Sequence, residues 1–68
     1  MDSAKLEYEM KKKKISILQM CEKLGISRSA FYRKCNGYSE FTLSEIQDIL
    51  NVLDLDSPMD IFFNSKVS

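Results

Sequence analysis

The 68-residue sequence contains no histidine and no tryptophan, one proline, two glycines and two cysteines. Without histidine the chain lacks the usual partner of cysteine in zinc sites, and two cysteines make a poor disulfide framework. We therefore expect Cys21 and Cys35 to be reduced thiols and no metal to be bound. With so few glycines there is no glycine-rich loop to hold phosphate groups. These absences argue against cofactor-dependent chemistry.

Catalytic groups are equally scarce. A chain of this length buries only about 60% of its unfolded surface, so its core needs nearly every apolar residue and cannot also enclose a deep substrate cavity. Neither cysteine has an evident base beside it, and no pair of carboxylates marks a pocket. We predict one binding domain over residues 1–68, which is not an enzyme and has no cofactor or small-molecule ligand.

Long apolar runs are missing as well. No segment approaches the roughly 20 apolar residues of a membrane span, and the charged first residues lack the apolar stretch of a signal peptide. The composition, 44% hydrophobic and 29% charged, is typical of a soluble globular domain. We expect a cytoplasmic protein that folds alone or as a dimer.

The charges balance overall but are unevenly distributed. Ten cationic and ten anionic side chains give a net charge of zero, yet residues 1–37 carry +5 and residues 38–68 carry −5. Such a separation predicts a basic face for a polyanion such as nucleic acid. The alternative is a chance asymmetry.

Capping residues mark the helix starts. Ser16 and Thr42 each begin a capping box, because Gln19 and Glu45 follow three positions later and can return a hydrogen bond to the cap. Ser27 is a third N-cap. An apolar residue precedes each of the three caps.

Helix ends agree with these starts. Gly25 and Gly37 follow two apolar-periodic segments, where a left-handed residue can finish a helix. Ser57 before Pro58 is typical of the start of a last short helix. No strand pattern competes over any long segment. The predicted helices span residues 3–13, 17–24, 28–35, 43–53 and 58–63, with Leu6, Met10, Leu43, Ile46, Ile49, Leu50 and Leu53 facing inward.

The second and third predicted helices form a helix-turn-helix pattern. They are short, and a turn containing Gly25 joins them. The small Cys21 lies four positions before this glycine, where the helices must approach closely. The apolar contacts between the helices come from Met20, Leu24, Ile26 and Phe31. The alternative is an ordinary helical hairpin.

These residues resemble the small phage-repressor and Cro class of helix-turn-helix proteins, the XRE family, over about residues 6–63. The segments 31–46 and 60–63 are most similar to short phage and prophage members from Gram-positive bacteria. The resemblance implies a compact, all-α, five-helix, lambda-repressor-like DNA-binding domain in the cytoplasm of a bacterial host. Its usual run of residues corresponds to Ser16, Met20, Cys21, Leu24, Gly25, Ile26, Ser27 and Gly37.

The sequence departs from the family pattern at two places. Ile17 stands where relatives often have a glutamine that contacts phosphate or base. Lys34 and the small Cys35 stand where an apolar residue usually ends the recognition helix, which predicts altered packing against the next helix.

The third helix carries the candidates for base recognition. With Ala30 and Phe31 facing inward, Arg28, Ser29, Tyr32 and Arg33 share the outer face. Arginine can donate two hydrogen bonds to guanine, serine can donate or accept, and tyrosine can contact phosphate or a thymine methyl group. The alternative is a solvated helix face, or for Tyr32 a ring folded over the junction with the next helix.

Candidate phosphate contacts flank this helix, and they position the protein without specifying sequence. The lysines have an alternative role, since cations stabilise a helix C-terminus without DNA. The candidates are Lys11, Lys12, Lys13, Lys14, Ser16, Asn36, Tyr38 and Ser39.

The C-terminal segment has more large apolar residues than one side of a short helix can bury. One interpretation places Ile61 and Phe62 in the core. The other assigns Met59, Phe62 and Phe63 to a homodimer contact, which suits a protein whose single recognition helix contacts only a few base pairs.

The leading hypothesis is therefore a sequence-specific, double-stranded DNA-binding transcriptional regulator of phage type, a repressor acting through the major groove. The alternative is a protein-interaction module with the same fold, such as an antirepressor or a phage assembly factor. The acidic second half, the zero net charge and the absent glutamine favour the alternative. The basic first half with Arg28 and Arg33 opposes it.

Overall fold

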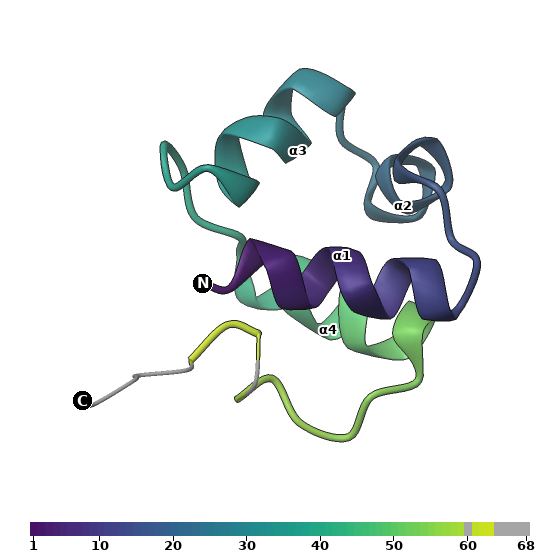
Figure 1. The fold of residues 1–68 in the computed structure, drawn as a ribbon. Helices are drawn as coiled ribbons and strands as arrows, with labels where there is room; N and C mark the ends of the chain where they lie inside the picture. The colour runs from purple at the N-terminus through teal and green to yellow at the C-terminus, as the bar shows by residue number, and fades with distance from the viewer. Residues whose placement is uncertain (60, 64–68) are drawn as a thin grey trace.

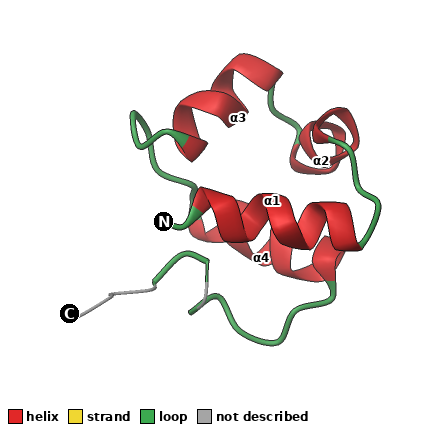
Figure 2. Cartoon of the chain, in the orientation of Figure 1, coloured by secondary structure: helices red, strands yellow, loops and turns green. Residues whose placement is uncertain are grey.

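A computed structural model describes residues 1–59 and 61–63 of the chain. It contains four helices, α1 (Ser3–Lys12), α2 (Ile17–Leu24), α3 (Arg28–Cys35) and α4 (Leu43–Leu53) (Figure 1). The described residues contain no strand, so the all-α prediction is confirmed (Figure 2). The predicted bounds of α2, α3 and α4 are confirmed, and α1 ends one residue earlier than predicted.

Hydrogen bonds within a few residues explain why the helices begin where they do. Both predicted capping boxes are present. In α2, the Ser16 hydroxyl accepts from the Gln19 N–H at 3.1 Å, and the Gln19 side chain accepts from the Ser16 N–H at 2.8 Å. Ser27 caps α3 as predicted. Asp2, which we did not predict as a cap, begins α1.

Each helix ends at a left-handed residue. In α3 the Tyr38 N–H donates to the Arg33 carbonyl at 2.9 Å, which closes the helix with a Schellman motif. The four left-handed residues are Lys14 (φ 60°), Gly25 (φ 72°), Gly37 (φ 86°) and Asp54 (φ 56°). Only the two glycines were predicted, because lysine and aspartate adopt a positive φ at a steric cost.

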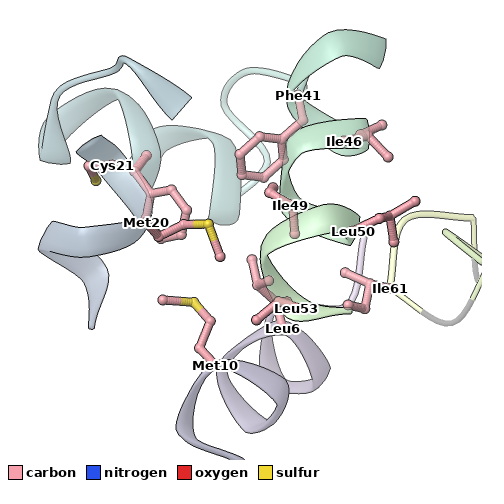
Figure 3. Close-up of a cluster of buried hydrophobic side chains, with 11 residues drawn as sticks. Leu6, Met10, Met20, Cys21, Phe41, Ile46, Ile49, Leu50, Leu53 and Ile61 are labelled. Carbon is pink, nitrogen blue, oxygen red and sulfur yellow. The ribbon is translucent and has the colours of Figure 1, made fainter. Parts of the chain in front are cut away.

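The core lies around α4, which packs against α2. Figure 3 shows Leu6 and Met10 of α1 and Met20 of α2 approaching the α4 residues Ile49 and Leu53. The complete buried hydrophobic set is Leu6, Met10, Met20, Cys21, Phe31, Phe41, Ile46, Ile49, Leu50, Leu53 and Ile61. None of the four helices in the described part of the chain has the length and apolar character that a membrane span requires.

The prediction that Leu43 faces inward is wrong. Its side chain is 80% exposed, whereas the other four members of its predicted stripe are buried. Leu43 is the first residue of α4, directly after the Thr42 cap, and it lies at the edge of the apolar stripe. Periodicity identified the stripe but not the length of α4 that neighbouring elements cover.

The segment after α4 returns to the start of the chain. The Asp2 N–H donates to the Ile61 carbonyl at 2.7 Å, and the Ile61 side chain is fully buried. The Phe62 ring meets Phe41 edge-on, with centroids 5.7 Å apart. The core role predicted for Ile61 and Phe62 is confirmed. Met59 and Phe63 remain exposed.

The fifth helix predicted at 58–63 is not confirmed. Its described residues, 58, 59 and 61–63, form turns and bends, and Asp60 lies outside the described residues. The Ser57 hydroxyl accepts from the Met59 N–H, two positions on, as an N-cap does. One helical hydrogen bond, from the Phe62 N–H to the Pro58 carbonyl, is present. So short a segment gains few helical bonds to offset the cost of starting a helix.

Candidate nucleic-acid interface

The helix-turn-helix prediction corresponds to α2, α3 and the turn between them. α2 packs against both α3 and α4, and Figure 1 shows α3 on the outside of the helical body. Among the side chains predicted to join the two helices, those of Cys21 and Phe31 are buried. Those of Leu24 and Ile26 are half-buried. The tight turn at Gly25 therefore leaves one side of α3 facing solvent.

All four base-recognition candidates lie on that side. Arg28, Ser29, Tyr32 and Arg33 are exposed, whereas Phe31 is buried. No acidic side chain among the described residues forms a salt bridge with either arginine. The Tyr32 ring packs edge-on against Phe31 at 6.3 Å and keeps about half of its surface exposed, at 48%. The outer face of α3 is thus a set of hydrogen-bonding groups with free guanidinium charges.

A groove of about 380 Å³ runs beside this face, between α1, the turn before α2, and α3. Three phosphate candidates, Lys11, Ser16 and Asn36, line it together with Tyr32. Its apolar lining includes Leu6, Met10, Ile15, Ile17 and Phe31. The structure therefore brings together candidates that lie up to 25 positions apart in the sequence.

The lysine run does not form a single patch. Lys11 lines the groove, but the Lys12 ammonium lies 4.0 Å from a Glu9 carboxylate oxygen and 5.6 Å from the centre of the Tyr8 ring. Lys13 caps α1 and Lys14 adopts the left-handed conformation. Successive residues of a helix point about 100° apart, so adjacent lysines diverge. The geometry favours Lys11 as the phosphate contact from this run.

Glu9, which we did not single out from the sequence, explains the position of Lys12. Its side chain is buried, and Lys5 lies on its other side with a nitrogen–oxygen distance of 3.4 Å. The spacings of three and four positions to the two lysines were the available signal.

The remaining phosphate candidates lie in the connection between α3 and α4. Tyr38 and Ser39 are both exposed. Ser39 lines a second cavity, of about 360 Å³, together with Lys34 and Phe41, rather than the groove that contains Ser16. These two residues thus lie apart from the groove cluster.

Lys34 has a partner that the sequence did not indicate. Its ammonium donates to Oε1 of Glu45 at 2.7 Å, and both side chains are only 14% exposed. Burial alone raises the pKa of Glu45, but the hydrogen bonds from Lys34 and Thr42 and the positive charge of Lys34 outweigh it and lower that pKa. The altered packing expected at Lys34 therefore takes the form of an ion pair between α3 and α4.

The cysteines are free, as predicted. Burial, followed by the nearby charge of Glu7 and by Cys21, raises the pKa of the Cys35 thiol to about 11. Burial also raises the pKa of Cys21, against an opposing effect of Arg28. A thiol with a raised pKa stays protonated at neutral pH and is a poor nucleophile.

Comparison with known families agrees with this geometry. Residues 5–62 match the model of the Cro/C1-type helix-turn-helix DNA-binding domain, so the match begins inside α1, covers α2, α3 and α4, and ends in the segment that follows α4. Searches of curated proteins and of solved structures find no match. From its helix-turn-helix, its exposed third helix and this match over most of its length, the chain belongs to the Cro/C1-type family of helix-turn-helix DNA-binding domains, the XRE family.

Proposed function

We propose that this DNA-binding domain is a sequence-specific transcriptional regulator of phage type, which represses by occupying an operator in double-stranded DNA. The observation that carries the proposal is the outer face of α3, where Arg28 and Arg33 are exposed and free of acidic partners among the described residues. Free guanidinium groups on a solvent-facing helix are suited to the major groove. The protein acts by binding, not by catalysis.

Base recognition in this proposal belongs to four side chains of α3. Arg28 and Arg33 each donate to guanine, and a good bidentate contact contributes about 1–3 kcal/mol of discrimination. Ser29 forms a hydrogen bond with a base edge. Tyr32, the α3 residue among these that also lines the groove, contacts a phosphate or a thymine methyl group.

Phosphate contacts come from the groove cluster of Lys11, Ser16 and Asn36. Since these residues flank Tyr32, a DNA strand lying along the groove would meet them beside α3. Residues 1–37 carry +5, so the same half of the chain attracts the backbone. For each phosphate that the protein neutralises, the slope of the logarithm of the binding constant against the logarithm of the salt concentration becomes more negative by about 0.9.

The regulator binds as a homodimer in this proposal. One recognition helix contacts few base pairs, and two-fold symmetry on a pseudo-palindromic site adds the contacts of a second. Met59 and Phe63 keep apolar surface exposed near the end of the described chain, whereas Phe62 packs against Phe41. The dimer contact is therefore assigned to Met59 and Phe63.

The decisive experiment is a selection from random double-stranded DNA with purified protein, at low and near-physiological salt. We expect enrichment of a two-fold related motif, and loss of enrichment in an Arg28→Ala, Arg33→Ala double variant. Lys23→Ala is the control, because it removes an exposed cation at the other end of α2 from Ser16. Equal enrichment by the double variant would overturn the assignment of bases to α3.

The second candidate function is a protein-interaction module, such as an antirepressor or assembly factor. It is favoured by zero net charge and by two apolar side chains, Tyr38 and Leu43, that are 81% and 80% exposed. This function predicts weak binding to random duplex even at low salt and a flat salt dependence. A steep salt dependence would reject it.

A further inference from the structure

α3 packs against α2 but has few direct attachments to α4. Phe31 is its only buried residue, and it meets Phe41 edge-on with ring centroids 5.9 Å apart. Beside this contact lies the cavity of about 360 Å³, lined by Lys34, Phe41, Ile46 and Phe62. The junction between the end of α3 and the start of α4 therefore borders an open hollow of the surface on one side.

The Lys34–Glu45 ion pair spans this junction. Oε1 of Glu45 accepts from the Lys34 ammonium at 2.7 Å and from the Thr42 N–H at 2.9 Å. Lys34 also donates to the Glu40 carbonyl at 3.4 Å and lies 5.7 Å from the centre of the Phe41 ring. One carboxylate oxygen thus connects α3 to the capping box that begins α4.

The hydrogen bond between Lys34 and Glu45 is expected to be stronger than a neutral one. Charge-assisted hydrogen bonds are shorter and roughly twice as strong as neutral ones, and a setting with little solvent strengthens them further. Lys34 directly follows Arg33 on α3, and a base contact tolerates only a few tenths of an ångström around 2.9 Å. A small change in the orientation of α3 therefore moves Arg33 out of hydrogen-bonding range.

We infer that the Lys34–Glu45 ion pair positions α3 for base recognition, so that both residues determine sequence specificity without touching DNA. This inference rests on the proposed function. Lys34 cannot serve as an ordinary phosphate contact, because its ammonium points inward to Glu45 and its side chain is 14% exposed. Its role is exerted through Arg33 and the other exposed residues of α3.

Glu45→Gln separates positioning from simple electrostatics. Glutamine at the third helical position still completes a capping box, so the start of α4 is kept. The variant also removes a negative charge, and by electrostatics alone it would bind all DNA more tightly. Positioning predicts the opposite for the selected site, namely weaker specific binding with unchanged or stronger binding to random duplex.

The experiment measures affinity for the selected site and for random duplex in four proteins. They are the wild type, Glu45→Gln, the conservative variant Lys34→Arg, and Glu40→Gln, which removes an exposed negative charge near the same junction. We expect Glu45→Gln to lower the ratio of specific to random affinity about tenfold, because a neutral amide oxygen accepts from the Lys34 ammonium much more weakly than a carboxylate does. Lys34→Arg and Glu40→Gln should keep the ratio within about threefold.

A second measurement needs no DNA. Residual dipolar couplings of backbone amides report the orientation of α3 relative to α4 in the free protein. We expect them to differ between the wild type and Glu45→Gln, and to be retained in Lys34→Arg. If Glu45→Gln does not fold, Lys34→Met, which keeps an apolar chain of similar length, takes its place in both measurements.

Three results would overturn the inference. If Glu45→Gln gains affinity equally for the selected site and for random duplex, the effect is purely electrostatic. If its residual dipolar couplings equal those of the wild type, other contacts hold α3. A ratio that falls equally in Glu40→Gln would show a general charge effect. A wild-type protein that enriches no sequence overturns the proposed function instead, and the couplings distinguish that failure from failure of the ion pair.

Discussion

α3 and α4 differ in how much of their surface they bury. α3 buries Phe31 alone, whereas α4 buries Ile46, Ile49, Leu50 and Leu53. Both helices start at a hydroxyl-capped residue and end at a left-handed one, so the difference lies in their surroundings and not in their local geometry. α4 lies at the centre of the core, and α3 packs against α2 with most of its own side chains in solvent.

This difference separates binding from stability in a small domain. Substitutions on the outer face of α3 can change DNA contacts at little cost to folding, because surface positions usually contribute within about 0.5 kcal/mol. The exceptions are Phe31 and Lys34, the two α3 residues that reach toward α4.

The largest expected effect is on Phe31. Phe31→Ala should lower the free energy of unfolding by about 3–5 kcal/mol, because it removes the one buried anchor of α3 and leaves a cavity. Urea denaturation followed by circular dichroism measures it, with Ser29→Ala as an exposed control on the same helix. A Phe31→Ala protein as stable as the control would show that α3 is anchored elsewhere.

Arg33→Ala should leave stability unchanged and weaken binding to the selected site by about 1–3 kcal/mol, with relaxed preference at one base position. Competition binding on the site and on its single-base variants measures both effects. An equal loss on every sequence would reassign Arg33 to a phosphate contact.

Acid should weaken the link between α3 and α4. The pKa of Glu45 in the folded protein is below its value in the unfolded chain, so the ionised carboxylate stabilises the fold above the ordinary glutamate pKa of about 4.3. This contribution disappears as the pH falls through the folded-state pKa. Unfolding measured from pH 7 downward should show a smaller acid loss in Glu45→Gln than in the wild type.

Glu40→Gln is the control for the acid experiment, because its side chain is exposed and forms no salt bridge among the described residues. It should retain the acid dependence of the wild type. Parallel curves for the wild type and Glu45→Gln would contradict the assignment of this stability to the ion pair.

The smallest effects concern the ends of the two helices. Gly37 closes α3 at φ 86° with open space where a side chain would lie, so Gly37→Ala should cost about 1 kcal/mol through backbone strain alone. Asp54 closes α4 at φ 56°, so Asp54→Gly should stabilise the protein by about 0.5 kcal/mol. Urea midpoints of the two variants should move in opposite directions, and a shift in the same direction would contradict this account.

Much of the fold was predictable because its signals are local. The caps at Ser16, Ser27 and Thr42 and the ends at Gly25 and Gly37 are confirmed. Each depends on hydrogen bonds that span five positions or fewer. The left-handed conformation of Lys14 and Asp54 was not predicted, because residues other than glycine seldom adopt a positive φ.

The candidate site was predictable only in part. Helical periodicity identified the exposed face of Arg28, Ser29, Tyr32 and Arg33, since a helix fixes which of its residues share a side. It could not show that Lys11 lies on the groove, because that depends on which elements pack against α1. The pairing of Lys12 with Glu9, three positions earlier in the same helix, was a local signal that we did not use.

By itself, the sequence determined the four helices, their caps and the exposed residues of α3, since backbone hydrogen bonding and periodicity act over a few positions. Tertiary structure decided the exposure of Leu43, the irregular segment that carries Ile61 into the core, and the ion pair between Lys34 and Glu45. These features join residues that are distant along the chain. Their contacts form only when α1, α3 and the C-terminal segment have packed around α4, which no local pattern encodes.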